Sequence, residues 1–195
     1  MKQITINLYN YNELDEKGKE KVKECYFDIL DPDEFTTMVL DELESMFPRS
    51  ELKIEYRLSY CQGDGLNIYG KLNINDVLDR YEFTEKEKRT LKTYCYHTSD
   101  NVVIPSNKHG YTYCYSDYIS FDNDVRLELE SMGYRDIKYG LLLRVNDDIR
   151  RDMRKLCDKY EELGYNYFYE ISDTELSEWC NDNGHMFTKD GSIYY

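Results

Sequence analysis

The side chains that could do chemistry in this chain are six cysteines, three histidines and a large excess of carboxylates. No two cysteines stand at the C-x-x-C spacing of a redox or zinc motif, and His97, His109 and His185 are scattered. No phosphate-binding loop, nucleophile elbow or H-E-x-x-H helix is present. A Cys–His nucleophile assembled through space stays open, although buried cysteines are usually inert. The sequence therefore predicts no catalytic residue, metal ligand or cofactor, and it favours a binding protein over an enzyme.

The carboxylates define which partners the chain can attract. Thirty-nine acidic residues against 25 basic ones give a net charge of -14. Such a chain is repelled by nucleic acids and anionic membranes and attracted to basic surfaces, of which nucleic-acid-handling proteins carry the largest. The alternative interpretation is that the charge only improves solubility.

The distribution of the acids favours a binding role. Six acids and no base lie between Asp31 and Met46, and seven acids and no Lys or Arg lie between Glu161 and Thr188. Such clusters repel themselves and lower stability, which favours a role in binding. The acids predicted to contact a partner are Asp33, Glu34, Asp41, Glu44, Glu170, Asp173, Glu175 and Glu178.

The segment Gln62-Gly63-Asp64-Gly65 is the most distinctive short motif. A phosphate-binding loop would lead into a helix, whereas residues 66–72 have the pattern of a strand. Residues 52–61 and 66–72 are therefore expected to pair antiparallel around a turn at Gly63–Gly65. Gln62 and Asp64, presented by this turn, are two further candidates for contact with a partner.

Hydrophobic periodicity predicts an alternation of helices and strands. The expected helices cover residues 12–30, 31–48, 73–81, 84–97, 124–132, 146–164 and 172–180. The expected strands are 3–9, 51–60, 66–72, two strands around the loop 105–110, and a final hairpin at Asp190-Gly191. Residues 137–145 are compatible with either structure. The sequence predicts one α+β domain over residues 1–195, an antiparallel sheet with helices packed mainly on one side.

One expected helix is basic and stands apart from the acidic ones. Its bases can pair with the acidic helices either inside the fold or between subunits, so a homodimer stays open. They are Arg150, Arg151, Arg154, Lys155 and Lys159. The cysteine usage, the charged N-terminal segment and the absence of an apolar run of ~18 residues predict a cytoplasmic protein with free thiols and no membrane contact.

Four segments resemble a family of small phage and prophage proteins that is mostly described as hypothetical. They are "YNELDEKGKEKVKE" at 11–24, "YCQGDGLNIYG" at 60–70, "HGYTYCYSDYISFD" at 109–122 and "FTKDGSIYY" at 187–195. The Gln-Gly-Asp-Gly hairpin and the terminal Phe-Thr-x-Asp-Gly motif carry most of the resemblance. Gly18 departs from the family pattern, which usually has alanine there. The resemblance implies a phage context and provides no catalytic residues.

Phages carry small acidic proteins that disarm host immunity, so the phage context gives a leading hypothesis. The chain is expected to inhibit a bacterial defence nuclease complex, of anti-CRISPR or anti-restriction type, by binding a basic protein surface in the host cytoplasm. Its carboxylates would mimic nucleic acid there, without direct nucleic-acid binding by the chain itself. The alternatives are an antitoxin-like or regulatory binding protein, and a protein that binds or degrades a nucleotide signal.

Overall fold

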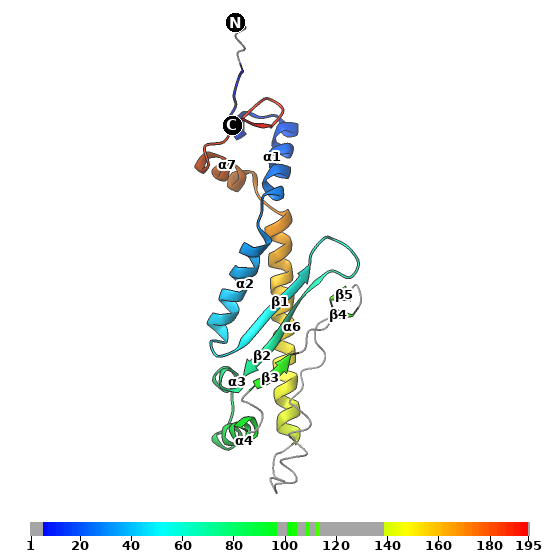
Figure 1. Ribbon diagram of the computed structural model, residues 1–195, viewed down its shortest axis with the longest axis vertical. Coiled ribbons are helices and arrows are strands. Elements are labelled where there is room, and N and C mark those ends of the chain that lie inside the picture. The colour runs from blue at the N-terminus through cyan, green and yellow to red at the C-terminus, as the bar shows by residue number, and fades with distance from the viewer. Residues whose placement is uncertain (1–5, 97–100, 105–107, 110–111, 114–138, 195) are drawn as a thin grey trace. The chain divides into compact units, whose positions relative to one another are not determined.

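The computed structural model describes residues 6–96, 101–104, 108–109, 112–113 and 139–194 (Figure 1). The contacts within the chain form two compact units. The terminal unit comprises Met1–Pro32 with Gly164–Tyr195, and the central unit comprises Asp33–Leu163. Helices combined with antiparallel strands confirm the predicted α+β class. The prediction of a single domain over residues 1–195 stays a prediction.

The central unit is organised around an antiparallel sheet of order β1-β2-β3. Its strands are β1 (Glu51–Arg57), β2 (Gly65–Asn73) and β3 (Asn101–Ile104). Ile54 lies opposite Ile68, and Leu72 lies opposite Val102. Because side chains alternate along a strand, this register gathers the apolar residues on one face of the sheet. Leu66, Ile68, Leu72, Val102 and Ile104 on that face are almost fully buried.

Two helices cover this apolar face. They are α2 (Pro32–Met46) and α6 (Tyr139–Tyr169), which enters the terminal unit at Gly164. The ring of Phe35 on α2 meets the ring of Tyr56 on β1 edge to face, with 5.2 Å between centroids. Lys159 of α6 forms an ion pair with Glu42 of α2. The sheet in the central unit therefore has its main helices on one side, as predicted (Figure 1).

Shorter elements complete the central unit. They are α3 (Ile74–Arg80), α4 (Glu85–Tyr96), β4 (Lys108–His109) and β5 (Thr112–Tyr113). Thr84 and Glu87 form a capping box at the start of α4, since the Thr84 amide donates to the Glu87 carboxylate at 2.9 Å and the Glu87 amide donates to the Thr84 hydroxyl at 3.3 Å.

The terminal unit has a small core of its own. Its elements are a 3₁₀ turn at Tyr11–Glu13, α1 (Glu16–Asp28), α7 (Asp173–Asp182), β6 (Met186–Phe187) and β7 (Ile193–Tyr194). Tyr11, Val22, Leu176 and Phe187 are buried against one another. Burying side chains of this size stabilises a fold by about 1.5–3 kcal/mol each. The β6–β7 hairpin confirms the turn predicted at Asp190-Gly191.

Several sequence-based boundaries differ from the structure. Of the strand expected at 3–9, the described part contributes only one bridge, between Tyr9 and Phe187. The loop expected at 105–110 contains β4, which pairs with β5. The ambiguous segment is helical from Tyr139, and Gly164 does not end α6 because the helix continues to Tyr169. The helix expected at 124–132 lies outside the described residues.

The basic helix corresponds to α6, and its charges pair inside the central unit. Besides the Lys159–Glu42 pair, Arg150 lies 3.6 Å from Asp147 and Arg151 lies 2.6 Å from Asp148. Of these bases, Lys159 reaches an acidic helix inside the fold, whereas Arg150 and Arg151 pair with acids of α6 itself. Pairing of the basic helix between subunits stays a prediction.

Candidate protein-binding surfaces

The described cysteines differ in burial, and two of them, Cys157 and Cys180, are buried. Among the described residues, no three His, Cys, Asp or Glu side chains are close enough to hold a metal ion. Cys157 is buried, and burial raises the pKa of its thiol to about 12. Burial likewise raises the pKa of Cys180 to about 11. Thiols with such pKa values are poor nucleophiles at neutral pH, so these two cysteines have a packing role.

The Gln-Gly-Asp-Gly segment closes the predicted hairpin, but its loop is longer than expected. Pairing ends at Arg57 and resumes at Gly65, so the loop covers residues 58–64. The Asp64 side chain is only 5% exposed, and its carboxylate turns into the loop. It accepts hydrogen bonds from the amides of Ser59 at 2.6 Å and Cys61 at 2.8 Å.

The expectation that Asp64 contacts a partner is wrong, because its carboxylate is turned into the loop. Besides the two amide hydrogen bonds, the Arg57 guanidinium lies 3.6 Å from this carboxylate. Asp64 therefore stabilises the loop and is not presented to a partner. Gln62 is exposed at the same loop and keeps its place as a candidate contact residue.

The solvent face of α2 forms the first acidic surface. Asp33, Glu34, Asp41 and Glu44 are all exposed, as predicted, whereas Phe35, Val39 and Leu43 face the core. Residues three and four apart on a helix are neighbours, so Asp41 and Glu44 lie side by side. Neither of these two side chains forms an ion pair with a described residue. We call this face the α2 acidic face, with Asp33, Glu34, Asp41 and Glu44 as its members.

The second acidic surface is on α7, and two of its predicted members have structural partners. Asp173 accepts a hydrogen bond from the Tyr11 hydroxyl at 3.1 Å and lies 3.4 Å from Lys19. Glu175 accepts from the Ser172 amide at 2.9 Å as the second half of a capping box. These hydrogen bonds from Ser172 lower the pKa of Glu175.

The other acids on and next to α7 are available to solvent. Glu170 and Glu178 are exposed as predicted, and Asp182, one turn beyond Glu178, is exposed as well. The α7 acidic face is therefore defined by Glu178 and Asp182, with Glu175 as a neighbour that also caps the helix. Neither Glu178 nor Asp182 forms a side-chain hydrogen bond or an ion pair with a described residue.

Sequence reasoning missed a buried carboxylate at the start of the sheet. Asp76 on α3 has a side chain that is 1% exposed. It accepts hydrogen bonds from the Ser50 hydroxyl at 2.6 Å, the Arg49 amide at 3.0 Å and the Arg49 guanidinium at 3.1 Å. Arg49 also reaches the exposed Asp79 at 2.8 Å. This network fixes the turn between α2 and β1. The local sequence pattern does not predict the network, because its partners are about 26 residues apart in the chain.

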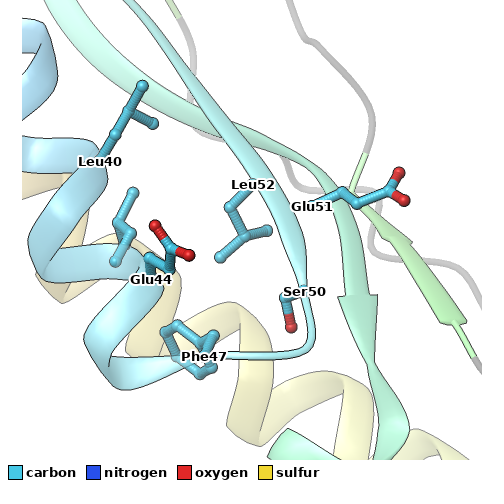
Figure 2. A pocket seen from close by; sticks show the side chains of 7 residues that line it. Leu40, Glu44, Phe47, Ser50, Glu51 and Leu52 are labelled. Carbon is cyan, nitrogen blue, oxygen red and sulfur yellow. The ribbon is translucent and has the colours of Figure 1, made fainter.

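That turn borders a pocket of about 220 Å³ between α2 and β1. Figure 2 shows the side chains of Leu40 and Phe47 on one wall and Leu52 on the other. The carboxylate of Glu44, a member of the α2 acidic face, lies next to Leu52, below Leu40 and above Phe47 in this view. The acidic face and the pocket are therefore continuous on one surface.

Among the described residues, no helix is both long enough and apolar enough to cross a membrane.

Comparison of the chain with protein-family models, with curated proteins and with solved structures gave no match.

Proposed function

We propose that this chain is a phage-encoded inhibitor that binds a basic surface of a bacterial defence nuclease complex, of anti-CRISPR or anti-restriction type. The α2 acidic face and the α7 acidic face supply the contacts, and carboxylates take the place of nucleic-acid phosphates. The phage context comes from the resemblance of the Gln-Gly-Asp-Gly and Phe-Thr-x-Asp-Gly segments. The target is a protein, and the chain itself does not bind nucleic acid.

The observation that carries the proposal is the set of exposed carboxylates without internal partners. Asp41, Glu44 and Glu178 are exposed and contact no basic described residue. Their neighbour Glu42, by contrast, is neutralised by Lys159. The fold therefore compensates some of its acids and leaves Asp41, Glu44 and Glu178 uncompensated by described residues, in a chain of net charge -14. Uncompensated carboxylates create a negative electrostatic potential at the surface, and this potential raises the rate of association with a basic groove.

The fold lends itself to binding more than to turnover. The buried thiols have raised pKa values. Two of the prominent carboxylates, Asp64 and Asp76, are occupied by hydrogen bonds within the fold. An inhibitor that acts by binding needs only a stable surface, which the helices α2 and α7 provide.

Phage plating tests the proposal directly. The chain is expressed in strains that each carry one nuclease-based defence system, CRISPR–Cas or restriction–modification, and in an isogenic strain without defence. Plating of a susceptible phage should rise on at least one defended strain and stay unchanged on the isogenic strain. No rise on any strain of a panel that represents both kinds of system would refute the proposal.

Charge reversal at the acidic faces identifies the contacts. The variants Asp41→Lys/Glu44→Lys and Glu178→Lys/Asp182→Lys alter exposed positions. Glu175 is left intact because its carboxylate caps α7. The matched control is Glu20→Lys/Glu24→Lys, which changes the net charge by the same amount on α1, where lysines alternate with the acids. At least one acidic-face variant should lose protection while the control keeps it; equal loss in all three would show a dependence on net charge alone.

A further inference from the structure

The pocket between α2 and β1 combines an apolar lining with one carboxylate. Leu40, Leu43 and Phe47 come from α2 and its C-terminal end, and Leu52 comes from β1. Its volume of about 220 Å³ is below the ~300–1,000 Å³ of pockets that hold small-molecule ligands. This size suits a single inserted side chain of a partner protein.

The polar groups around the pocket differ in their availability. The Ser50 hydroxyl is engaged, since it donates to Asp76 at 2.6 Å and accepts from the Asn73 amide at 2.9 Å. The Glu51 carboxylate points away from the pocket in Figure 2 and lies 3.6 Å from Lys71. Glu44 is the remaining charged group: its carboxylate faces the pocket and forms no ion pair with a described residue.

These features select the chemistry of the occupant. An apolar lining contacts an aliphatic stem favourably, and a single carboxylate at the mouth pairs with a cationic end group. Lysine and arginine both have this form. The guanidinium is more weakly hydrated than an ammonium and offers a fork of donors that matches a carboxylate, so it loses less on entering a half-apolar pocket. Arginine is also enriched among the residues that dominate interface affinity.

We propose that the pocket receives an arginine side chain of the partner protein, with its stem between Leu40 and Leu52 and its guanidinium on Glu44. This inference rests on the proposed function, because it names the anchor by which a basic surface is held at the α2 acidic face. It assigns Glu44 a specific pairing role, whereas Asp41, which does not line the pocket, contributes only long-range attraction.

A titration with n-butylguanidinium, which has the stem and head of arginine, tests the assignment without the partner. The full-length protein is labelled with ¹⁵N, and amide shifts are followed as the probe is added. Saturable shifts should concentrate at residues 40–52. Glu44→Gln should weaken the affinity about three- to fivefold, the range of an exposed ion pair, and the matched control Asp41→Asn should not.

Three outcomes would overturn the assignment. They are shifts spread over all the acidic helices without saturation, equal affinity in the Glu44→Gln variant, and n-butylammonium binding as tightly as n-butylguanidinium. The titration needs no nuclease complex, so its failure alongside phage protection would reject the pocket and leave the proposed function standing. A localised, saturable shift without any phage protection would count against the proposed function alone.

Discussion

Replacing Asp76 with asparagine should destabilise the central unit strongly, although no charge is removed from the exposed surface. The side chain is 1% exposed and accepts three hydrogen bonds, from the Ser50 hydroxyl and from the amide and guanidinium of Arg49. Asparagine keeps one acceptor oxygen but presents an amide group to the donors around the other. Hydrogen bonds to charged groups contribute about 1.5–3 kcal/mol each, so the loss of one or two of them predicts a cost of about 1.5–6 kcal/mol.

Asp79→Asn is the matched control, because Asp79 contacts the same guanidinium from an exposed position. Its side chain is 69% exposed, and exposed ion pairs contribute about 0–1 kcal/mol. Urea unfolding should be followed by far-UV circular dichroism, since the single tryptophan, Trp179, lies in the terminal unit. Equal destabilisation by the two variants, or a cost of Asp76→Asn below about 1 kcal/mol, would refute the reasoning that burial and three donors make Asp76 the anchor of this turn.

Three further predictions concern other parts of the fold. Gly70→Ala should lower the free energy of unfolding by more than about 2 kcal/mol, because Gly70 has φ +128° and a Cβ there would lie 2.1 Å from the Glu51 carbonyl oxygen. Gly140→Ala on α6, where the added Cβ meets open space, should instead stabilise the protein slightly. The unfolding midpoints of the two variants test this pair of expectations. Hydrogen bonds from Lys21, Thr188 and Ser192 hold the pKa of Asp190 well below its usual range. The wild type should therefore be more stable than Asp190→Asn above the unfolded pKa of about 4, and this difference should shrink as the pH falls toward the depressed pKa. A difference in stability that stays constant down to pH 2 would contradict this. All six cysteines should titrate as free thiols after denaturation without reductant, and a count of four or fewer would indicate disulfides. In the native protein the exposed Cys61 should react with a thiol reagent well before the buried Cys157 and Cys180.

Local features of the fold were predictable from the sequence because their partners are close together in the chain. The helix expected at 172–180 begins at a capping box whose residues, Ser172 and Glu175, are only three positions apart in the chain. The strand expected at 51–60 corresponds to β1, and the glycines after it located the hairpin. The buried stripe of α2 likewise follows from a period of 3.6 residues, which is why the exposure of Asp41 and Glu44 was predicted correctly.

Features that depend on distant residues were not predictable in this way. The inward turn of Asp64 is an exception, since its partners Ser59 and Cys61 are only five and three positions away. It depends on the strand ending early, at Arg57, which the alternating pattern through residue 60 did not indicate. The Asp76 network joins residues about 26 positions apart. The pocket requires a strand residue, Leu52, to lie against the end of α2, and periodicity gives no register between a helix and a strand.

The central claim is that the acidic faces hold a basic surface of a nuclease complex, and one measurement tests it most directly. DNA cleavage by the purified complex from a protected strain is titrated with wild type, Asp41→Lys/Glu44→Lys and the control Glu20→Lys/Glu24→Lys at 50 mM and 200 mM salt. Exposed charges are screened within about 8 Å at physiological ionic strength, so inhibition by the wild type should weaken at the higher salt.

At low salt the Asp41→Lys/Glu44→Lys variant should inhibit at least about tenfold less well than the wild type, a loss of about 1.4 kcal/mol, and the control should stay close to the wild type. Thermal stability should be nearly the same for all three proteins, because both altered pairs are exposed. Undiminished inhibition by Asp41→Lys/Glu44→Lys at both salt concentrations would contradict the claim that the α2 acidic face makes the contact.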